Sequence, residues 1–73
     1  MILGENSLRA FGANVAAARK KRGMTQEELA DKLGISQAMI NYIESGKKKP
    51  SLETALTIAK VFGTTVDNLM VTA

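Results

Sequence analysis

The sequence predicts an all-α protein, a compact bundle of five helices that forms one domain over residues 1–73, with its core at about residues 7–71. Three observations lead to this prediction. Apolar residues recur at helical spacing in five segments, hydroxyl residues that can cap a helix stand before these segments, and glycines stand after most of them. No internal repeat, low-complexity stretch or linker divides the chain.

The first helix is expected to begin after Ser7, which can act as its cap. Gly23 should end it, and Met24 then follows as an expected core residue. One side of this helix carries the residues at core spacing: Leu8, Phe11, Val15, Ala18 and Arg19.

The second helix should begin at Gln26, because Thr25 and Glu28 form a capping-box pattern. Gly34 can end it in the left-handed conformation. After a short turn, a third helix capped by a serine is expected over about residues 37–45. Two helices joined by so short a glycine-containing turn form a helix-turn-helix.

The fourth helix is expected to start after Ser51 and to end at Gly63, with Val61 facing away from the core. Its predicted buried stripe consists of Leu52, Ala55, Leu56, Ala59 and Phe62. Thr65 can cap a short last helix, whose apolar residues are Val66, Leu69 and Met70.

The third helix has two chemically different sides. Its spacing places Ile40, Ile43 and Glu44 together, facing inward. The opposite side is polar and uncharged, with Gln37 at its flank, and consists of Ala38, Asn41, Tyr42 and Ser45. Amide side chains can bond an adenine edge and an alanine methyl can touch a thymine methyl, so this side suits base reading in a major groove. A merely solvated helix face is the alternative.

Two basic blocks, Arg19–Arg22 and Lys47–Lys49, hold seven of the ten Lys and Arg residues. A solvated loop is the plain interpretation of such a run. Beside a polar reading face, however, we expect these blocks to contact phosphate, which supplies position and salt-dependent affinity. The net charge of +3 agrees with a polyanionic partner.

Three spaced motifs resemble the Cro/repressor type of helix-turn-helix domain, also called the XRE family. They read R-x3-G-M-T-Q-E-E-L-A-x2-L-G-I-S, E-S-G-K-K-K-P-S and L-x6-A-x2-F-G, and the resemblance covers about Phe11 to Met70. It implies a lambda-repressor-like bundle of five helices in which the second and third helices form the DNA-binding unit.

The resemblance also implies roles for single residues. Gln26 is expected to contact phosphate, and Arg19 is expected to form a structural ion pair with Glu44. The expected base-reading residues are Gln37, Ala38 and Tyr42, with Asn41 near them. We expect Thr25 and Ser45 to join the lysines of residues 47–49 as phosphate-binding residues.

The expected partner is double-stranded DNA, bound by a homodimer. A two-fold dimer would carry two recognition helices about 34 Å apart and would read a near-palindromic operator. The dimer contacts are expected at Pro50, Val66, Asn68 and Met70.

Composition excludes several other classes. The chain has no cysteine and no histidine, so it lacks disulfides, a thiolate metal site and the usual imidazole base, and neither enzyme activity nor a metal or cofactor is expected. No small-molecule ligand is evident. No apolar run approaches the roughly 18 residues of a membrane span, and residues 1–7 are too short and polar for a signal peptide. The expected location is the cytoplasm.

The sequence therefore predicts a sequence-specific DNA-binding transcriptional regulator, a repressor of prokaryotic or phage type, with helix 37–45 in the major groove. The alternative is a protein-interaction module, either an antitoxin that masks a toxin or an adaptor that joins a transcription factor to the polymerase machinery. That alternative needs apolar surface away from the DNA side, for which Val61, Met70 and Val71 are the candidates.

Overall fold

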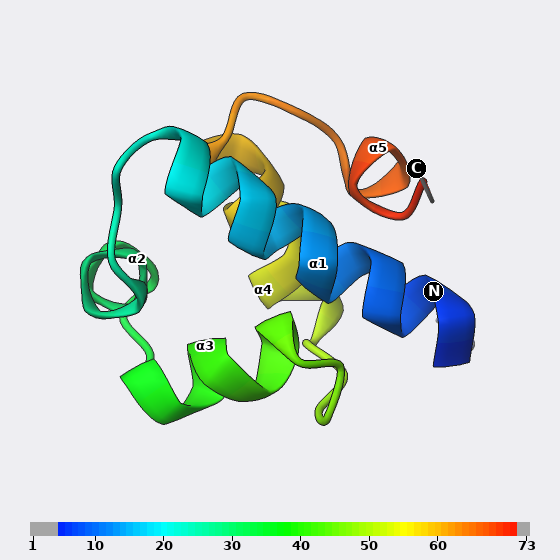
Figure 1. Cartoon of the computed structure of the whole chain (residues 1–73), viewed down its shortest axis with the longest axis horizontal. Coiled ribbons are helices and arrows are strands. Elements are labelled where there is room, and N and C mark those ends of the chain that lie inside the picture. Colours follow the sequence, from blue (N-terminus) through cyan, green and yellow to red (C-terminus); the bar gives the residue numbers. More distant parts are fainter. Residues whose placement is uncertain (1–4, 72–73) are drawn as a thin grey trace.

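Five helices make up the regular structure of residues 5–71, the part of the chain that the computed structural model describes. They are α1 (Glu5–Lys21), α2 (Gln26–Leu33), α3 (Gln37–Glu44), α4 (Leu52–Val61) and α5 (Val66–Leu69). In Figure 1, α1 crosses the middle of the molecule, α3 lies below it, α2 lies at the left, α4 lies behind, and α5 lies at the upper right. The predicted all-α bundle is confirmed.

The boundaries of α2 and α3 agree with the capping signals. The Thr25 backbone N–H donates to Glu28 Oε1 over 2.9 Å, and the Glu28 N–H donates to Thr25 Oγ1 over 3.0 Å. Gly34 ends α2 with φ of 69°, in the left-handed region. Ser36 caps α3 by accepting from the N–H of Met39. The helix-turn-helix is therefore present, with α3 ending at Glu44, one residue before the expected boundary.

The start of the first helix differs from the prediction. Ser7 lies inside α1, which already includes Glu5 and Asn6. A serine can cap a helix only where the chain before it leaves the helical conformation. Neither Glu5 nor Asn6 is a glycine or a proline, so nothing in these two residues forces the chain out of the helix at Ser7.

The buried stripe of α4 also differs from the prediction. Leu52 and Leu56 are 52% and 48% exposed. The other predicted members, Ala55, Ala59 and Phe62, are buried as expected, and Ile58 is buried with them. Val61, expected to face away, packs against the core. Leu52, Leu56 and Ile58 all lie at helical spacing from the buried alanines, and the packing of α4 against its neighbours selects Ile58.

One contiguous core joins all five helices, and Met24 packs against it as expected. Its buried members are Phe11, Val15, Leu29, Ala30, Ile40, Ile43, Ala55, Ile58, Ala59, Phe62, Val66 and Leu69. The side-chain amide of Asn14 donates to the carbonyl oxygens of Leu69 and Val71, over 2.7 and 2.8 Å, and so holds the end of α5 against α1. Within residues 5–71, no helix has both the length and the apolar character needed to cross a bilayer.

Candidate nucleic-acid interface

The helix α3 presents one side to the core and the other to solvent. Ile40 and Ile43 are fully buried. Every residue expected on the reading side is exposed: Gln37, Ala38, Asn41, Tyr42 and Ser45. The structure therefore places the predicted base-reading residues together on one accessible, uncharged helix face.

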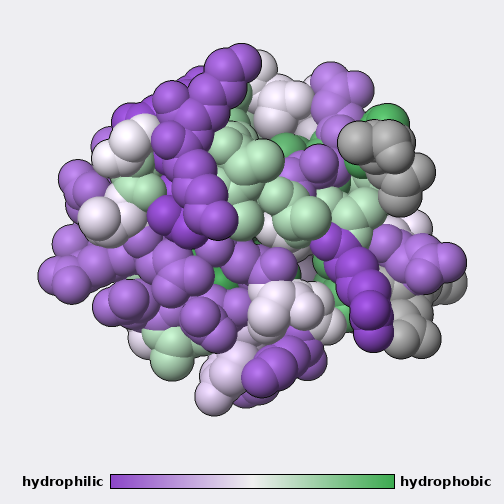
Figure 2. Space-filling view, in the orientation of Figure 1, coloured by the Kyte–Doolittle hydropathy of each residue, from purple (hydrophilic) through white to green (hydrophobic). Residues whose placement is uncertain are grey.

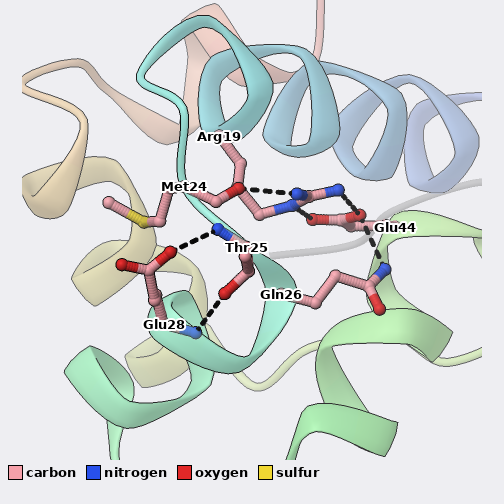
Figure 3. Close-up of polar contacts among 6 residues, drawn as sticks. All are labelled: Arg19, Met24, Thr25, Gln26, Glu28 and Glu44. Atoms are coloured by element: carbon pink, nitrogen blue, oxygen red, sulfur yellow. Dashed lines mark hydrogen bonds and ion pairs between the residues drawn. The ribbon is translucent and has the colours of Figure 1, made fainter.

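Glu44 anchors the inner side of α3 to α1. Its Oε2 lies 2.7 Å from Arg19 Nε, and its Oε1 lies 3.0 Å from Arg19 Nη2, which makes a two-pronged ion pair (Figure 3). The two side chains are only 10% and 7% exposed. Arg19 Nη1 donates to the carbonyl oxygen of Met24 over 2.7 Å. The hydrogen bond to Glu44 raises the pKa of Arg19, against the smaller opposing effect of burial.

The same carboxylate also joins α2 to this pair. Gln26 Nε2 donates to Glu44 Oε1 over 3.0 Å, so one side chain of α3 is held by residues of both α1 and α2 (Figure 3). An amide nitrogen carries two hydrogens. Gln26 therefore keeps one N–H for the phosphate contact that the resemblance implies.

The backbones of α1 and α3 approach each other closely at Gly12. This residue is buried in the middle of α1, beside the carbonyl groups of Ile43 and Glu44. Gly12 had no predicted role. An isolated glycine inside a helical pattern is the signal that could have drawn attention to it.

The three lysines of residues 47–49 are exposed and follow directly after the reading helix. The backbone N–H groups of Lys47 and Lys48 both donate to the carbonyl oxygen of Tyr42, over 2.8 and 3.2 Å, so the loop folds back onto the end of α3. Lys48 Nζ lies 5.3 Å from the centre of the Tyr42 ring, at the distance of a cation–π contact. The lysine cluster is thus held beside the reading face.

Two further residues expected at phosphate are also exposed. Thr25 Oγ1 accepts from the N–H of Glu28 in the helix cap, and its hydroxyl contributes to the lowered pKa of Glu28, so this hydroxyl would have to turn to donate to a phosphate. Ser45 Oγ donates to the carbonyl oxygen of Tyr42 over 3.2 Å, so its hydroxyl would have to turn to donate to a phosphate.

The upstream basic block does not serve as expected. Arg19 is buried in the pair with Glu44. Arg22 donates to the carbonyl oxygens of Val61 and Phe62, over 2.7 and 3.0 Å, and its guanidinium lies 5.1 Å from the centre of the Phe62 ring. The last carbonyl oxygens of a helix have no N–H donor within the helix, and at the end of α4 Arg22 is the donor. The expectation that the whole block contacts phosphate is therefore corrected for these two arginines.

The expected dimer contacts are only partly accessible. Pro50 and Val66 are buried within the single chain, so the expectation is corrected for these two residues. Asn68 is exposed, and Met70 is half-buried against the core. Large exposed apolar residues lie elsewhere, at Leu52, Leu56 and Val71. Leu52 and Leu56 were not predicted to be exposed, because the sequence pattern placed them in the buried stripe of α4.

Hydrophilic residues cover most of the face that α1 and α3 form (Figure 2). Apolar residues show between them as a pale-green area in the upper centre of the view and as smaller spots elsewhere. Within the described part of the chain, no group of three or more acidic, histidine or cysteine residues is placed to hold a metal ion.

Comparisons with known proteins agree with this geometry. A family model described as helix-turn-helix matches residues 15–69. An uncharacterized HTH-type transcriptional regulator of Archaeoglobus fulgidus is 47% identical over 53 residues, which are 73% of this chain and 76% of that protein. The HTH-type transcriptional activator BcrR of Enterococcus faecalis is 37% identical over 60 residues, 82% of this chain and 29% of that protein.

A solved structure extends the likeness to the fold. The restriction-modification controller protein C.AhdI of Aeromonas hydrophila superposes with a TM-score of 0.77 and 27% identity, over 85% of this chain and 94% of that one. None of these relatives is named as an enzyme. The family match runs from the middle of α1 to the end of α5 and covers more than half of the sequence. The chain belongs to the helix-turn-helix family of the XRE type.

Proposed function

We propose that this chain is a sequence-specific DNA-binding regulator of transcription that inserts α3 into the major groove of its operator. The arrangement of charged and uncharged groups around α3 carries the proposal. The exposed side of α3 is polar and uncharged, the buried side is fixed by Glu44, and three exposed lysines follow the helix directly. A reading surface needs hydrogen-bonding groups in fixed positions with cations beside them, and this arrangement supplies both.

In this proposal the exposed face of α3 reads the bases. The amides of Gln37 and Asn41 can each bond an adenine edge in two places, and the methyl of Ala38 can touch a thymine methyl. Tyr42 offers a ring and a hydroxyl, and 38% of the residue is exposed. These four residues would decide which sequence is bound.

The phosphates would be held on both sides of the reading helix. Lys47, Lys48 and Lys49 follow its end, and Gln26 stands at the start of α2 with one amide hydrogen available. Thr25 would donate after its hydroxyl turns away from Glu28. Ser45 would join them after its hydroxyl turns. Such contacts orient the protein on the duplex and supply salt-dependent affinity without selecting a sequence.

We further propose that two copies bind one near-palindromic operator, with their α3 helices about 34 Å apart. Leu52 and Leu56 lie one turn apart on the exposed side of α4, so they offer the apolar surface that a second copy can cover. Asn68 and Met70 would add to this contact. The alternative occupant is a different protein, as in an antitoxin or an adaptor, but a homodimer explains the leucines without such a partner.

Repression is the mode of action that we propose. A protein bound across a promoter excludes the polymerase by occupancy and needs no further contact. The relative BcrR is named as an activator, so the position of the operator must decide between the two modes. A reporter gene with the operator across the promoter should lose expression when the protein is supplied, and an increase would favour activation.

The direct test of DNA binding is the selection of bound sequences from a random DNA pool. We expect enrichment of one inverted repeat whose half-sites are one helical turn apart. A pool that shows no enriched sequence would contradict the proposal. If affinity capture from cell extract instead yielded one protein in fixed ratio and no DNA, the interaction-module alternative would replace it.

A further inference from the structure

A pocket lies on the side of the molecule away from the proposed DNA-binding helix. Figure 1 shows α3 below α1 and the connection between α4 and α5 above it, so α1 separates the two regions. The pocket has a volume of about 420 Å³, which falls in the range of small-molecule sites, roughly 300 to 1,000 Å³. Its lining residues are Ala18, Lys21, Arg22, Phe62, Thr64 and Leu69.

The floor of the pocket is apolar and comes from three different helical regions. Ala18 belongs to α1, Phe62 caps the end of α4, and Leu69 is the last residue of α5. Phe62 and Leu69 are almost fully buried, so their positions are fixed by the core. A hydrocarbon group resting on this floor would contact α1, the end of α4 and α5 at the same time.

The polar groups around the pocket are donors. Lys21 and Arg22 have no carboxylate within ion-pair distance among residues 5–71, and no acidic residue lines the pocket. Two backbone carbonyls and the Phe62 ring hold the Arg22 guanidinium in place without cancelling its charge through an acid. Thr64 Oγ1 already accepts a hydrogen bond from Asn68, which leaves its hydroxyl hydrogen to donate.

We propose that this pocket binds a small amphipathic anion, with its carboxylate at Lys21 and Thr64 and its hydrocarbon chain on the floor of Ala18, Phe62 and Leu69. The charge and the shape of the site both support this class of ligand. Lysine donates charge-assisted hydrogen bonds to carboxylates, and the apolar floor favours a hydrocarbon body over a free inorganic anion. Of the basic block, Lys21 would then contact the carboxylate, and Arg22 would line the same pocket. The inference does not depend on the proposed DNA binding.

Decanoate, below its critical micelle concentration, is the probe for this site. We expect saturable binding at one site by calorimetry, with the largest changes in backbone amide NMR shifts at Ala18, Thr64 and Leu69. Binding only to the folded state must also raise Tm as the decanoate concentration rises. 1-Decanol, which has the same chain without the charge, should bind much more weakly.

Two lysine variants separate a built site from general attraction of anions. Lys21→Glu should weaken decanoate binding about tenfold or more, because a charge-assisted hydrogen bond is replaced by repulsion. Lys20→Glu makes the same charge change at an exposed neighbour outside the pocket and should leave binding nearly unchanged. Both variants should have similar Tm values without decanoate.

Four results would each overturn the inference, and three of them compare variants, probes or sites. They are an equal loss of binding in the two lysine variants, equal binding of decanol and decanoate, and NMR shifts centred on the exposed Leu52 and Leu56 of α4. Absence of saturable binding would also overturn it. None of these measurements involves DNA, so the inference and the proposed function fail or stand separately.

Discussion

Gly12 of α1 and Ile43 of α3 approach so closely that no side chain fits between them. A Cβ atom at residue 12 would lie 2.2 Å from the carbonyl oxygen of Ile43 and 2.8 Å from that of Glu44. Both obstacles are backbone atoms of the reading helix, so relief requires α1 and α3 to move apart. This contact sets the distance between the two helices.

The Gly12→Ala variant tests that contact through the sign of its effect. In an unobstructed helix the change would stabilise the protein by about 0.5–1 kcal/mol. Here we expect it to lower the free energy of unfolding by about 1–3 kcal/mol, as overpacking does. Urea denaturation gives the answer, and an increase in stability would show that the helices can separate freely.

Removal of Glu44 should have a larger effect. The Glu44→Ala change leaves the guanidinium of Arg19 buried without its partner, and we expect a loss of about 3–5 kcal/mol in the free energy of unfolding. Glu53→Ala, at an exposed acid of α4, is the matched control and should change stability little. Chemical denaturation measures both. A loss below about 1 kcal/mol for Glu44→Ala is typical of an exposed pair and would contradict the burial of this one.

The capping box of α2 should make stability depend on acid pH. Hydrogen bonds from the Thr25 backbone N–H, with a smaller contribution from its hydroxyl, lower the pKa of Glu28. Because the folded pKa lies below the unfolded value of about 4.3, this stabilisation is complete above the unfolded value. It is lost as the pH falls through the folded pKa.

Thermal unfolding at a series of acid pH values tests this dependence. Glu28→Gln keeps an oxygen that can accept the Thr25 bond but cannot titrate, so we expect its Tm to vary less with pH than that of the unchanged protein. Identical profiles for Glu28→Gln and the unchanged protein would exclude Glu28 as a source of acid sensitivity.

Base recognition and phosphate binding should be affected by different substitutions. Gln37→Ala should weaken binding to the operator by about 1–3 kcal/mol, relax the preference at one base position and leave binding to scrambled DNA nearly unchanged. Lys49→Ala should weaken binding to both DNAs alike and make the negative slope of log K against log salt shallower by about 1. Titrations at several salt concentrations distinguish them. Equal losses on both DNAs for Gln37→Ala would mean that this face does not read sequence.

The dimer surface can be tested at Leu56. A charge at the centre of an apolar contact is unfavourable, so Leu56→Glu should convert a two-to-one complex on the palindrome into a much weaker one with a single chain. Thr57→Glu adds a charge one residue along α4, outside the pair of exposed leucines, and serves as the control. Sedimentation of the complexes gives the ratio. A two-to-one complex of unchanged affinity for Leu56→Glu would place the dimer contact elsewhere.

The predictable parts of this fold depend on contacts between near neighbours in the sequence. Thr25 caps a helix through Glu28, three residues away, and Gly34 ends the same helix through its own backbone conformation. The bounds of α2 and α3, and with them the composition of the reading face, follow from such signals. The edge of the buried stripe on α4 does not, because Leu52, Leu56 and Ile58 all lie at helical spacing from Ala55 and Ala59, and only packing against other helices decides which of them are buried.

The remaining features involve partners far apart in the chain. Arg22 finds its carbonyl partners at the end of α4, and Asn14 finds its own at the end of α5. Long polar side chains can reach many such groups, and sequence spacing does not identify which. The close approach at Gly12 likewise depends on where α3 lies.

The carboxylate of Glu44, held from α1 and α2 at once, has a consequence for the rates of DNA binding. Glu44, at the C-terminal end of α3, is already fixed in one rotamer and holds the helix in place. Little ordering of this end of the helix is therefore needed when α3 enters a groove. We expect association at or above the roughly 10⁵–10⁷ M⁻¹s⁻¹ of pre-formed surfaces, because the lysines steer the approach. The association rate constant would then be similar for all DNA sequences. The operator would be distinguished by how slowly the protein leaves it.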